Sequence, residues 1–312
     1  MLKRITATGV GLVLLCATAA CGSDARDELA LTTPSTSVPT IGIAPAPAVS
    51  GSGVPSVSAS PQQKLGAAAY TTSTTAPKAA TATTAAKPAN PAGWGSPVMV
   101  QDFNGSSLPA QWGTYDSPNG TPPRSGDMVS VSNGMLHIAG GVNSRVGKDV
   151  GGGVMYLKAQ KYGRWEVRFR AQAGAGYGAF VLLWPQNNED WPTVGEIDLA
   201  EVVASDRSTF GTFLHHGSAN HQVGLDATKA DFTEFHTVAV EWLPTRVTYY
   251  LDGKKFFNVT PSQIETGLPT ESAMNLAMQL DQGCGGYIAC RNGSTPSRVV
   301  MDVDWVRVYQ AP

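Results

Sequence analysis

Hydrophobic and polar residues alternate in several short stretches of the chain after about residue 95. In residues 163–170, Trp165, Val167 and Phe169 fall on one face of an extended strand, and charged residues fall on the other. Other strand-like stretches lie at residues 235–241, 246–251 and 299–309. No long stretch has a helical period, and Gly and Pro interrupt the chain at short intervals, so we expect an all-β fold.

A hairpin turn is predicted inside this region. Asp252-Gly253 separates the strand-like residues 246–251 from Phe256-Phe257, and Asp-Gly is a preferred pair for a two-residue turn between antiparallel strands. The roughly 217 residues from 96 onward are enough for one β-sandwich, and we expect residues 96–312 to form a single domain.

The beginning of the chain is typical of an exported protein. Within residues 1–21, Lys3 and Arg4 precede a short apolar stretch that is poorly suited to span a membrane. Small residues before Cys21 resemble a bacterial lipoprotein cleavage site, after which Cys21 would carry lipid and fasten the protein to a membrane. The alternative is an ordinary signal peptide cut near the same place. Either form places the protein outside the cell, at the outer face of the cell membrane or in the cell wall.

Residues 22–95 differ in composition from the rest of the chain. They are rich in Pro, Thr, Ala and Ser and contain almost no aromatic residues. Such a segment cannot bury enough apolar surface to offset its ordering entropy, so we expect a disordered tether. A flexible coil of this length spans about 45 Å, enough to hold a domain away from a membrane surface.

The charge of the chain limits the classes of molecule it is expected to bind, and its cysteines predict a disulfide. The 312 residues carry a formal net charge of −2, only 15% are charged, and no run of Lys or Arg stands out, so nucleic acid is not an expected partner. A near-neutral balance is compatible with an uncharged polysaccharide. Cys284 and Cys290 lie close together in a Gly-rich loop, and in an exported protein we expect them to form a disulfide rather than a metal site.

Three acidic residues within six positions mark the most informative strand. Glu196, Asp198 and Glu201 are interleaved with Ile, Leu and Val, although acidic residues are depleted in strands. Simple alternation would place Glu196 and Asp198 on one face and turn Glu201 into the core, where an unpaired charge is unfavourable. A β-bulge near Leu199-Ala200 would return Glu201 to the face of Glu196, and bulges are enriched beside active sites.

Such an arrangement fits a retaining glycosidase, which needs two carboxyl groups about 5–5.5 Å apart. We assign Glu196 as the nucleophile, Glu201 as the general acid and base, and Asp198 as the group that tunes them by charge and hydrogen bonding. The alternative is a solvated polar face of a strand, on which the acids serve solubility alone.

Residues 195–201 resemble the E-x-D-x-x-E signature of glycoside hydrolase family 16, in the bulged form typical of its laminarinase-type members. Further stretches similar to the family lie at residues 103–105, 162–168, 191–192, 235–242, 250–253 and 303–309. The resemblance covers residues 98–310. It implies a jelly-roll β-sandwich of two antiparallel sheets, with the substrate in a cleft across the concave sheet.

The resemblance also implies substrate-binding residues. Trp191 would form the wall of the subsite that holds the cut sugar, and Trp184 is a second candidate platform. His215 is similar to a histidine that faces the acid and base, although His216 would take this role if the register slipped. Gln279 stands where relatives often have Asn or Gln near the cleft.

No cofactor is expected for catalysis, but some relatives bind a structural calcium ion. The similar positions here are the Asp304 side chain and backbone carbonyls near Asp102 and Gly134, and oxygen ligands suit calcium.

The function implied is endo-acting hydrolysis of β-1,3 or mixed 1,3/1,4-linked glucan. We expect a monomer, because no exposed apolar stripe is apparent in the sequence. Two alternatives remain open at this point. One is a hydrolase or transglycosylase acting on another β-polysaccharide such as galactan, and the other is a non-catalytic sugar-binding module.

Overall fold

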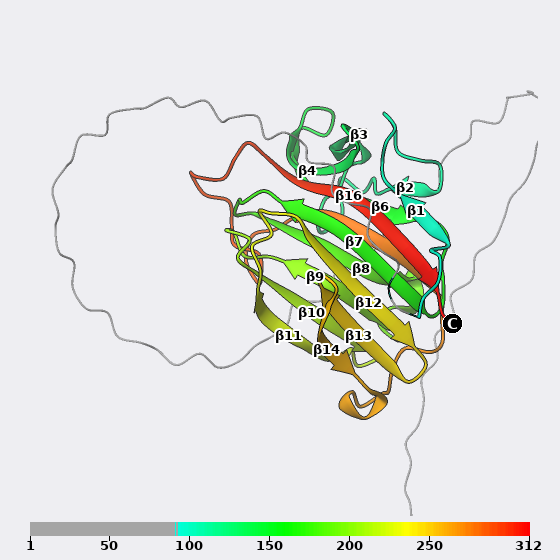
Figure 1. Ribbon diagram of the computed structural model, residues 1–312. Helices are drawn as coiled ribbons and strands as arrows, with labels where there is room; N and C mark the ends of the chain where they lie inside the picture. Colours follow the sequence, from blue (N-terminus) through cyan, green and yellow to red (C-terminus); the bar gives the residue numbers. More distant parts are fainter. Residues whose placement is uncertain (1–90, 92) are drawn as a thin grey trace, which may run out of the picture. The chain divides into compact units, whose positions relative to one another are not determined.

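The computed structural model describes residue 91 and residues 93–312. The expected signal peptide at 1–21 with Cys21, and nearly all of the expected tether at 22–95, lie outside the described residues. Within the described part, two antiparallel sheets lie face to face as two layers (Figure 1). This arrangement confirms the predicted all-β sandwich. No helix among these residues has the length and apolar character needed to cross a membrane.

The first layer is a nine-stranded sheet with the order β14-β13-β12-β7-β16-β4-β3, in which β1 also pairs with β16 and β5 with β4. Its strands are β1 (Met99–Gln101), β3 (Val129–Ser132), β4 (Met135–Asn143), β5 (Lys148–Val150), β7 (Gly163–Ala171), β12 (His236–Leu243), β13 (Arg246–Leu251), β14 (Lys254–Val259) and β16 (Arg298–Gln310).

The second layer is a seven-stranded sheet with the order β11-β10-β9-β8-β15-β6-β2. Its strands are β2 (Trp112–Thr114), β6 (Gly152–Tyr156), β8 (Tyr177–Pro185), β9 (Glu196–Val202), β10 (Thr209–His216), β11 (His221–Lys229) and β15 (Met274–Gln282). Three short 3-10 helices complete the described elements: η1 (Gly126–Met128), η2 (Asn188–Asp190) and η3 (Pro261–Gln263).

The hydrophobic core fills the space between the two sheets. Trp165, Val167 and Phe169 of β7 are each at most 1% exposed, as the alternation of this strand predicts. They pack in one cluster with inward-facing residues of the other sheet, such as Val181 of β8 and Ile197 of β9. Full burial of an aliphatic or aromatic side chain of this size stabilises the fold by about 1.5–3 kcal/mol.

The outer face of β7 is buried too, which its alternating pattern does not predict. Arg164 forms ion pairs with Glu166 at 2.7 Å and with Glu241 of β12 at 2.8 Å, and all three side chains are at least nine-tenths buried. Trp94 donates from its indole nitrogen to the same Glu241 oxygen at 2.8 Å. The chain therefore contacts the sandwich two residues before position 96, at a position that the sequence assigns to the tether.

The predicted hairpin is confirmed between β13 and β14. Asp252 and Gly253 have φ angles of 49° and 76°, so both central residues adopt the left-handed conformation that a two-residue turn of this kind requires.

Candidate active site

Strand β9 contains the β-bulge that the spacing of its acids predicts. Across from β8, the pairing passes from Ala200 directly to Asp198 and leaves Leu199 without a partner. The pairing with β10 is interrupted at the same place. The predicted bulge near Leu199-Ala200 is therefore confirmed.

The bulge decides which way the acids face. Ile197 and Leu199 are at most 1% exposed and belong to the core between the sheets. Glu201 opposes Phe180 of β8, whose ring belongs to a separate apolar cluster on the outer face of the seven-stranded sheet. Because directly opposed residues of paired strands share a face, Glu201 lies on the outer face with Glu196 and Asp198.

Thr212 of β10 holds the backbone of the bulge. Its hydroxyl donates to the Asp198 carbonyl oxygen at 2.6 Å and approaches the Leu199 carbonyl oxygen at 3.3 Å. The Thr212 side chain is fully buried. Its hydroxyl thus links β10 to the backbone of β9 at the bulge.

Glu196 lies at the start of β9 and is 4% exposed. Burial raises the pKa of Glu196 to about 7, although a hydrogen bond from Trp191 and contact with Asp198 act in the opposite direction. The Trp191 indole nitrogen donates to Glu196 Oε2 at 2.8 Å. Trp191 also stacks on Trp184, with ring centroids 5.6 Å apart. Trp184 is only 2% exposed, so it supports Trp191 from below rather than presenting its own face to solvent.

Asp198 is the most deeply buried of the three acids. It is 1% exposed, and neither carboxyl oxygen accepts a hydrogen bond from a nitrogen or hydroxyl donor of the described chain. Burial, followed by the negative charges of Glu196 and Glu201, raises the pKa of Asp198 well above its usual range. Asp198 therefore favours its neutral form more strongly than an exposed aspartate does.

Glu201 is placed to hold a proton near neutral pH. Burial raises the pKa of Glu201 to about 8, and the charges of Glu196 and Asp226 add to this effect. Asp226 lies on β11, and its Oδ1 would be 3.5 Å from a Cβ built on Gly211, the β10 residue that opposes Glu201. The two Glu side chains therefore differ in environment, although both lie on one bulged strand.

His215, rather than His216, faces the acids. His215 opposes Glu196 in the β9–β10 pair, and its Nε2 lies 3.5 Å from Asp198 Oδ2. Burial lowers the pKa of His215, which favours the neutral ring, and its Nδ1 lies 3.0 Å from the side-chain oxygen Oδ1 of Asn220. A neutral ring that donates from Nδ1 to Asn220 turns an unprotonated Nε2 toward Asp198. His216 instead contacts Glu271 at 3.1 Å, away from the acids.

Gln279 belongs to a buried polar group on the same outer face. Its amide nitrogen donates to Asp281 Oδ2 at 2.9 Å. Asp281 also accepts two hydrogen bonds from Arg124, at 2.7 and 2.8 Å. The Arg124 guanidinium lies 5.3 Å from the centre of the Tyr115 ring. The Gln279 carbonyl oxygen and the Tyr115 hydroxyl are buried and have no hydrogen-bond partner among the described residues.

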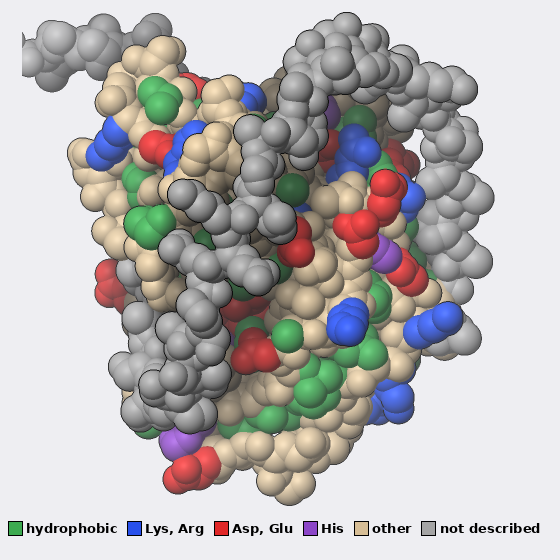
Figure 2. Space-filling view, turned by 90° about the vertical axis from the view of Figure 1, so that its left-hand side faces the viewer, with side chains coloured by type: hydrophobic (Ala, Val, Ile, Leu, Met, Phe, Trp, Pro, Cys, Tyr) green, Lys and Arg blue, Asp and Glu red, His purple; other side chains and the backbone are tan. Residues whose placement is uncertain are grey.

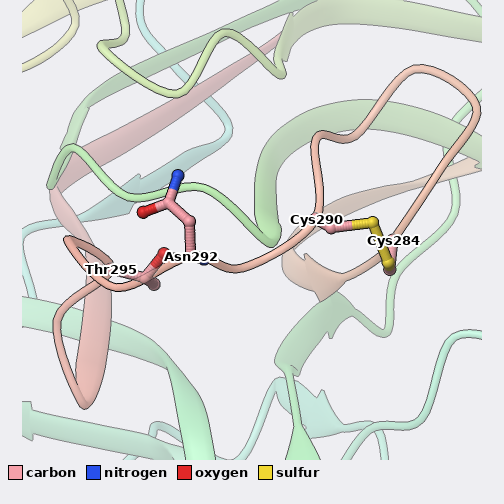
Figure 3. The surroundings of a disulfide bond; sticks show 4 residues. All are labelled: Cys284, Cys290, Asn292 and Thr295. Carbon is pink, nitrogen blue, oxygen red and sulfur yellow. Dashed lines mark hydrogen bonds between the residues drawn. A yellow bond between two sulfur atoms is a disulfide. The ribbon is translucent and has the colours of Figure 1, made fainter.

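The loop between β15 and β16 contains the predicted disulfide. Cys284 and Cys290 are joined by a disulfide bond (Figure 3), so this prediction is confirmed. Beyond the disulfide, Asn292 donates its backbone N–H to the Thr295 hydroxyl oxygen at 3.0 Å, and that hydroxyl donates to the Ala175 carbonyl at 3.2 Å. The loop is therefore fixed both by a covalent link and by hydrogen bonds to the turn before β8.

The residues expected to bind calcium are engaged in other contacts. Asp304 Oδ2 accepts a hydrogen bond from Arg168 at 2.5 Å, and the Asp102 carboxylate pairs with Arg307. A calcium ion at Asp304, with carbonyls near Asp102 and Gly134, would compete with a guanidinium for the same oxygen. The calcium site stays a prediction of the resemblance.

Within the described chain, one group of side chains converges in a way that could hold a metal. Glu196, Asp198 and His215 each offer one ligand atom, and these atoms lie within 4.8 Å of one another. The hydrogen bonds of Glu196 with Trp191 and of His215 with Asn220 orient two of these side chains without an ion.

Sequence reasoning missed several residues of this site. Thr212 and Asn220 carry no sequence signal, because each acts through a contact with another strand or turn. Tyr115 and Arg124 come from a part of the chain far from β9, and only the fold brings them to the same face. Tyr287 could have been found as an aromatic residue between the two paired cysteines.

The comparisons with known proteins agree with this geometry. Residues 124–307, more than half of the chain, match the model of glycosyl hydrolases family 16. A β-glucanase of Rhodothermus marinus is 26% identical over 166 residues, which are 48% of this chain and 57% of that protein. A keratan-sulfate endo-1,4-β-galactosidase of Sphingobacterium multivorum is 28% identical over 220 residues, which are 66% of this chain and 48% of that protein.

Among solved structures, the laminarinase catalytic domain of Thermotoga maritima superimposes with a TM-score of 0.61 at 22% identity, covering 70% of this chain and 98% of that domain. This likeness shows that the two sheets form the predicted jelly-roll fold. The chain spans about half the length of the curated relatives it matches. On the family match and the shared fold, the chain belongs to glycosyl hydrolases family 16.

Proposed function

We propose that the protein is a retaining endo-glycoside hydrolase that cleaves β-1,3 or mixed 1,3/1,4-linked glucan. The observation that carries the proposal is the bulge of β9, which brings Glu196, Asp198 and Glu201 to one face beside Trp191. A polar strand face that serves solubility alone would leave its acids in water, whereas Glu196 and Asp198 are at most 4% exposed.

In the first step, the Glu196 carboxylate attacks the anomeric carbon while Glu201 gives its proton to the glycosidic oxygen. The bond between the anomeric carbon and that oxygen breaks, and a glycosyl ester forms on Glu196. In the second step, Glu201 takes a proton from water, and the resulting hydroxide attacks the anomeric carbon and releases Glu196.

The electrostatics of the site support this division of roles. Burial and neighbouring charges raise the pKa of Glu201, whereas the hydrogen bond from Trp191 lowers the pKa of Glu196 against the effect of its burial. The Trp191 indole N–H stabilises the ionised form of Glu196. Asp198 and His215 are positioning residues in this scheme, since His215 opposes Glu196 across the strand pair and its Nε2 lies 3.5 Å from Asp198 Oδ2.

Uncharged glucan suits the surroundings of the acids. The part of the surface visible in Figure 2 carries acidic and basic side chains scattered among uncharged surface, rather than one continuous charged patch. The β-glucanase relative supports the choice of glucan. Trp191 is the aromatic side chain best placed to contact the apolar face of a pyranose ring at Glu196.

The test is to incubate the purified protein with a panel of β-glucans and β-galactans and to measure the reducing ends released. We expect release from β-1,3 or mixed-linked glucan and its loss in Glu196→Gln, with binding retained. Failure of the wild type to release ends from any polysaccharide would support a binding module instead. Product analysis at high sugar concentration would show whether transglycosylation competes with hydrolysis.

A galactan is the second candidate substrate. The galactosidase relative is similar over two-thirds of this chain, and its name describes an endo-1,4-β-galactosidase that acts on keratan sulfate. The same panel separates the two candidates, because each polysaccharide is assayed alone.

We further propose that the protein is exported and carries lipid on Cys21, which would place the enzyme at the outer face of the membrane or within the cell wall. The support is the sequence pattern around Cys21. Labelling of cells with a fatty-acid analogue should mark the wild type and leave Cys21→Ala unmarked.

A further inference from the structure

The disulfide loop carries an aromatic side chain to the outer face of the seven-stranded sheet. Tyr287, between Cys284 and Cys290, is 49% exposed. The next residue, Ile288, is 6% exposed and belongs to the apolar cluster on that face. Ile288 therefore anchors the loop on the sheet and leaves the Tyr287 ring available to a ligand.

Tyr287 lies close to the acids of β9. Its ring meets the edge of Phe180 at 6.3 Å with an interplanar angle of 89°, and Phe180 is the β8 residue opposite Glu201. Burial raises the pKa of Tyr287, and the next causes are the charges of Glu201 and Asp281. The phenol is therefore within electrostatic range of both Glu201 and the buried polar group around Asp281.

Besides the two Asp198 oxygens, two buried polar atoms on this side of the sheet have no hydrogen-bond partner among the residues that the structure describes. They are the Tyr115 hydroxyl and the Gln279 carbonyl oxygen, on residues that are 1% and 8% exposed. Gln279 opposes Phe180, so it lies one strand from Phe180 on the same face. A Cβ at Gly153 would come within 2.3 Å of the Tyr115 ring and 3.1 Å of Gln279 Cβ, so the two side chains meet above this glycine. Because an unpaired buried polar group is unfavourable, a ligand that forms hydrogen bonds with both atoms would be stabilised here.

The charge of this region points to a neutral ligand. Arg124 lies near both phenols, but its guanidinium is held by two hydrogen bonds to Asp281, at 2.7 and 2.8 Å. The pair has no net charge, so within the described part of the chain Arg124 does not act as a free cation that would select an acidic sugar. A hydroxyl-rich neutral ring meets the requirements of both the unpaired atoms and the exposed aromatic face.

We propose that Tyr287, the Tyr115 hydroxyl and the Gln279 side-chain oxygen Oε1 form a subsite for one neutral pyranose unit of the substrate beside Glu201. The Cys284–Cys290 disulfide holds Tyr287 in this subsite. The proposal rests on the proposed function, because the unit bound there belongs to the chain that is cleaved.

The first experiment is to measure kcat and KM of Tyr287→Ala on the best polysaccharide of the panel. We expect KM to rise about five- to tenfold with kcat changed less than about twofold, because the ring binds ground state and transition state alike. Tyr250→Ala is the matched control, since Tyr250 lies on β13 of the other sheet. Its KM should equal that of the wild type, and thermal unfolding of both variants checks the fold.

The second experiment tests the disulfide. Dithiothreitol should raise the KM of the wild type by a similar factor and leave the KM of Tyr287→Ala unchanged, since the ring that the disulfide positions is already gone. An unchanged KM in Tyr287→Ala, or an equal effect of reduction on wild type and variant, overturns the proposal.

Binding without cleavage separates this proposal from the proposed function. The mobility of the protein in native gels containing laminarin reports binding even if no polysaccharide is cut. Wild type that binds laminarin but releases no ends refutes the hydrolase, whereas Tyr287→Ala with wild-type mobility in these gels refutes the subsite.

Discussion

Thr212→Val tests whether the bulge of β9 positions Glu201. The substitution keeps the shape of the side chain and removes only the hydroxyl, which donates to the Asp198 carbonyl at 2.6 Å from a fully buried position. A buried carbonyl left without its donor destabilises a protein by about 1–3 kcal/mol. For a domain of this size we expect Tm to fall by about 3–10 °C.

The effect on catalysis should exceed the effect on stability. If β9 relaxes toward regular pairing, Glu201 turns away from Glu196, and misplacement of a catalytic group by about 1 Å reduces the rate by about 10²-fold. We therefore expect kcat/KM for glucan to fall by about 10- to 100-fold, measured by release of reducing ends below the Tm of the variant.

Thr248→Val is the matched control for this change. Thr248 is 2% exposed on β13 of the other sheet, and its hydroxyl donates to Asn258 at 2.7 Å. We expect a comparable loss of Tm with kcat/KM within about twofold of the wild type. Thr212→Val that loses stability but keeps the kcat/KM of the control would refute the role of the bulge.

The remaining predictions concern charges. In a pH–rate series, kcat/KM should fall above about pH 8 as Glu201 loses its proton. Asp226→Asn should shift this fall to lower pH, because the Asp226 charge helps to raise the pKa of Glu201. A fall at the same pH in the variant contradicts the assignment of Glu201. Glu201→Gln should abolish cleavage yet raise Tm at pH 8.5 and leave it nearly unchanged at pH 4, as calorimetry would show. Arg207→Met should cost about 3–5 kcal/mol in thermal unfolding, because the fully buried Arg207 donates to five backbone carbonyls; a Tm near that of the wild type would refute this.

Local pattern predicted those parts of the fold that depend on neighbouring residues. The alternation of Trp165, Val167 and Phe169 identified the core face of β7, and Asp252-Gly253 identified a turn that requires two left-handed residues. The outer face of β7 could not be predicted in the same way. Its burial depends on Glu241 and Trp94, which lie more than 60 residues away in sequence and arrive only when the sheet is assembled.

The candidate site likewise contains residues that the local sequence predicts and residues that only the fold brings together. The common face of the acids of β9 and the bulge between them could be predicted from one rule. An unpaired charge is unfavourable in the core, so the strand cannot keep the simple alternation that would turn Glu201 inward. The neighbours that set their properties follow no local rule. Trp191 is five residues from Glu196 and could be proposed from the sequence, whereas Thr212, Asn220 and Tyr115 reach the site through contacts made by neighbouring strands and turns.

The buried acids of the site lower the free energy of unfolding, and contacts elsewhere in the molecule offset this loss. The pKa of Glu201 rises from its usual 4.5 to about 8, so the folded protein holds a proton that the unfolded chain releases in this pH window. Stability contributed by this group is therefore present below pH 4.5 and is lost as pH rises toward 8. A neutral amide at position 201 avoids that loss, which is why the Glu201→Gln prediction couples higher stability to lost activity. The wild type stays folded because Thr212, the Trp191 indole and the apolar contacts of the sheet hold the acids in place. The requirements of catalysis and of stability therefore oppose each other at β9.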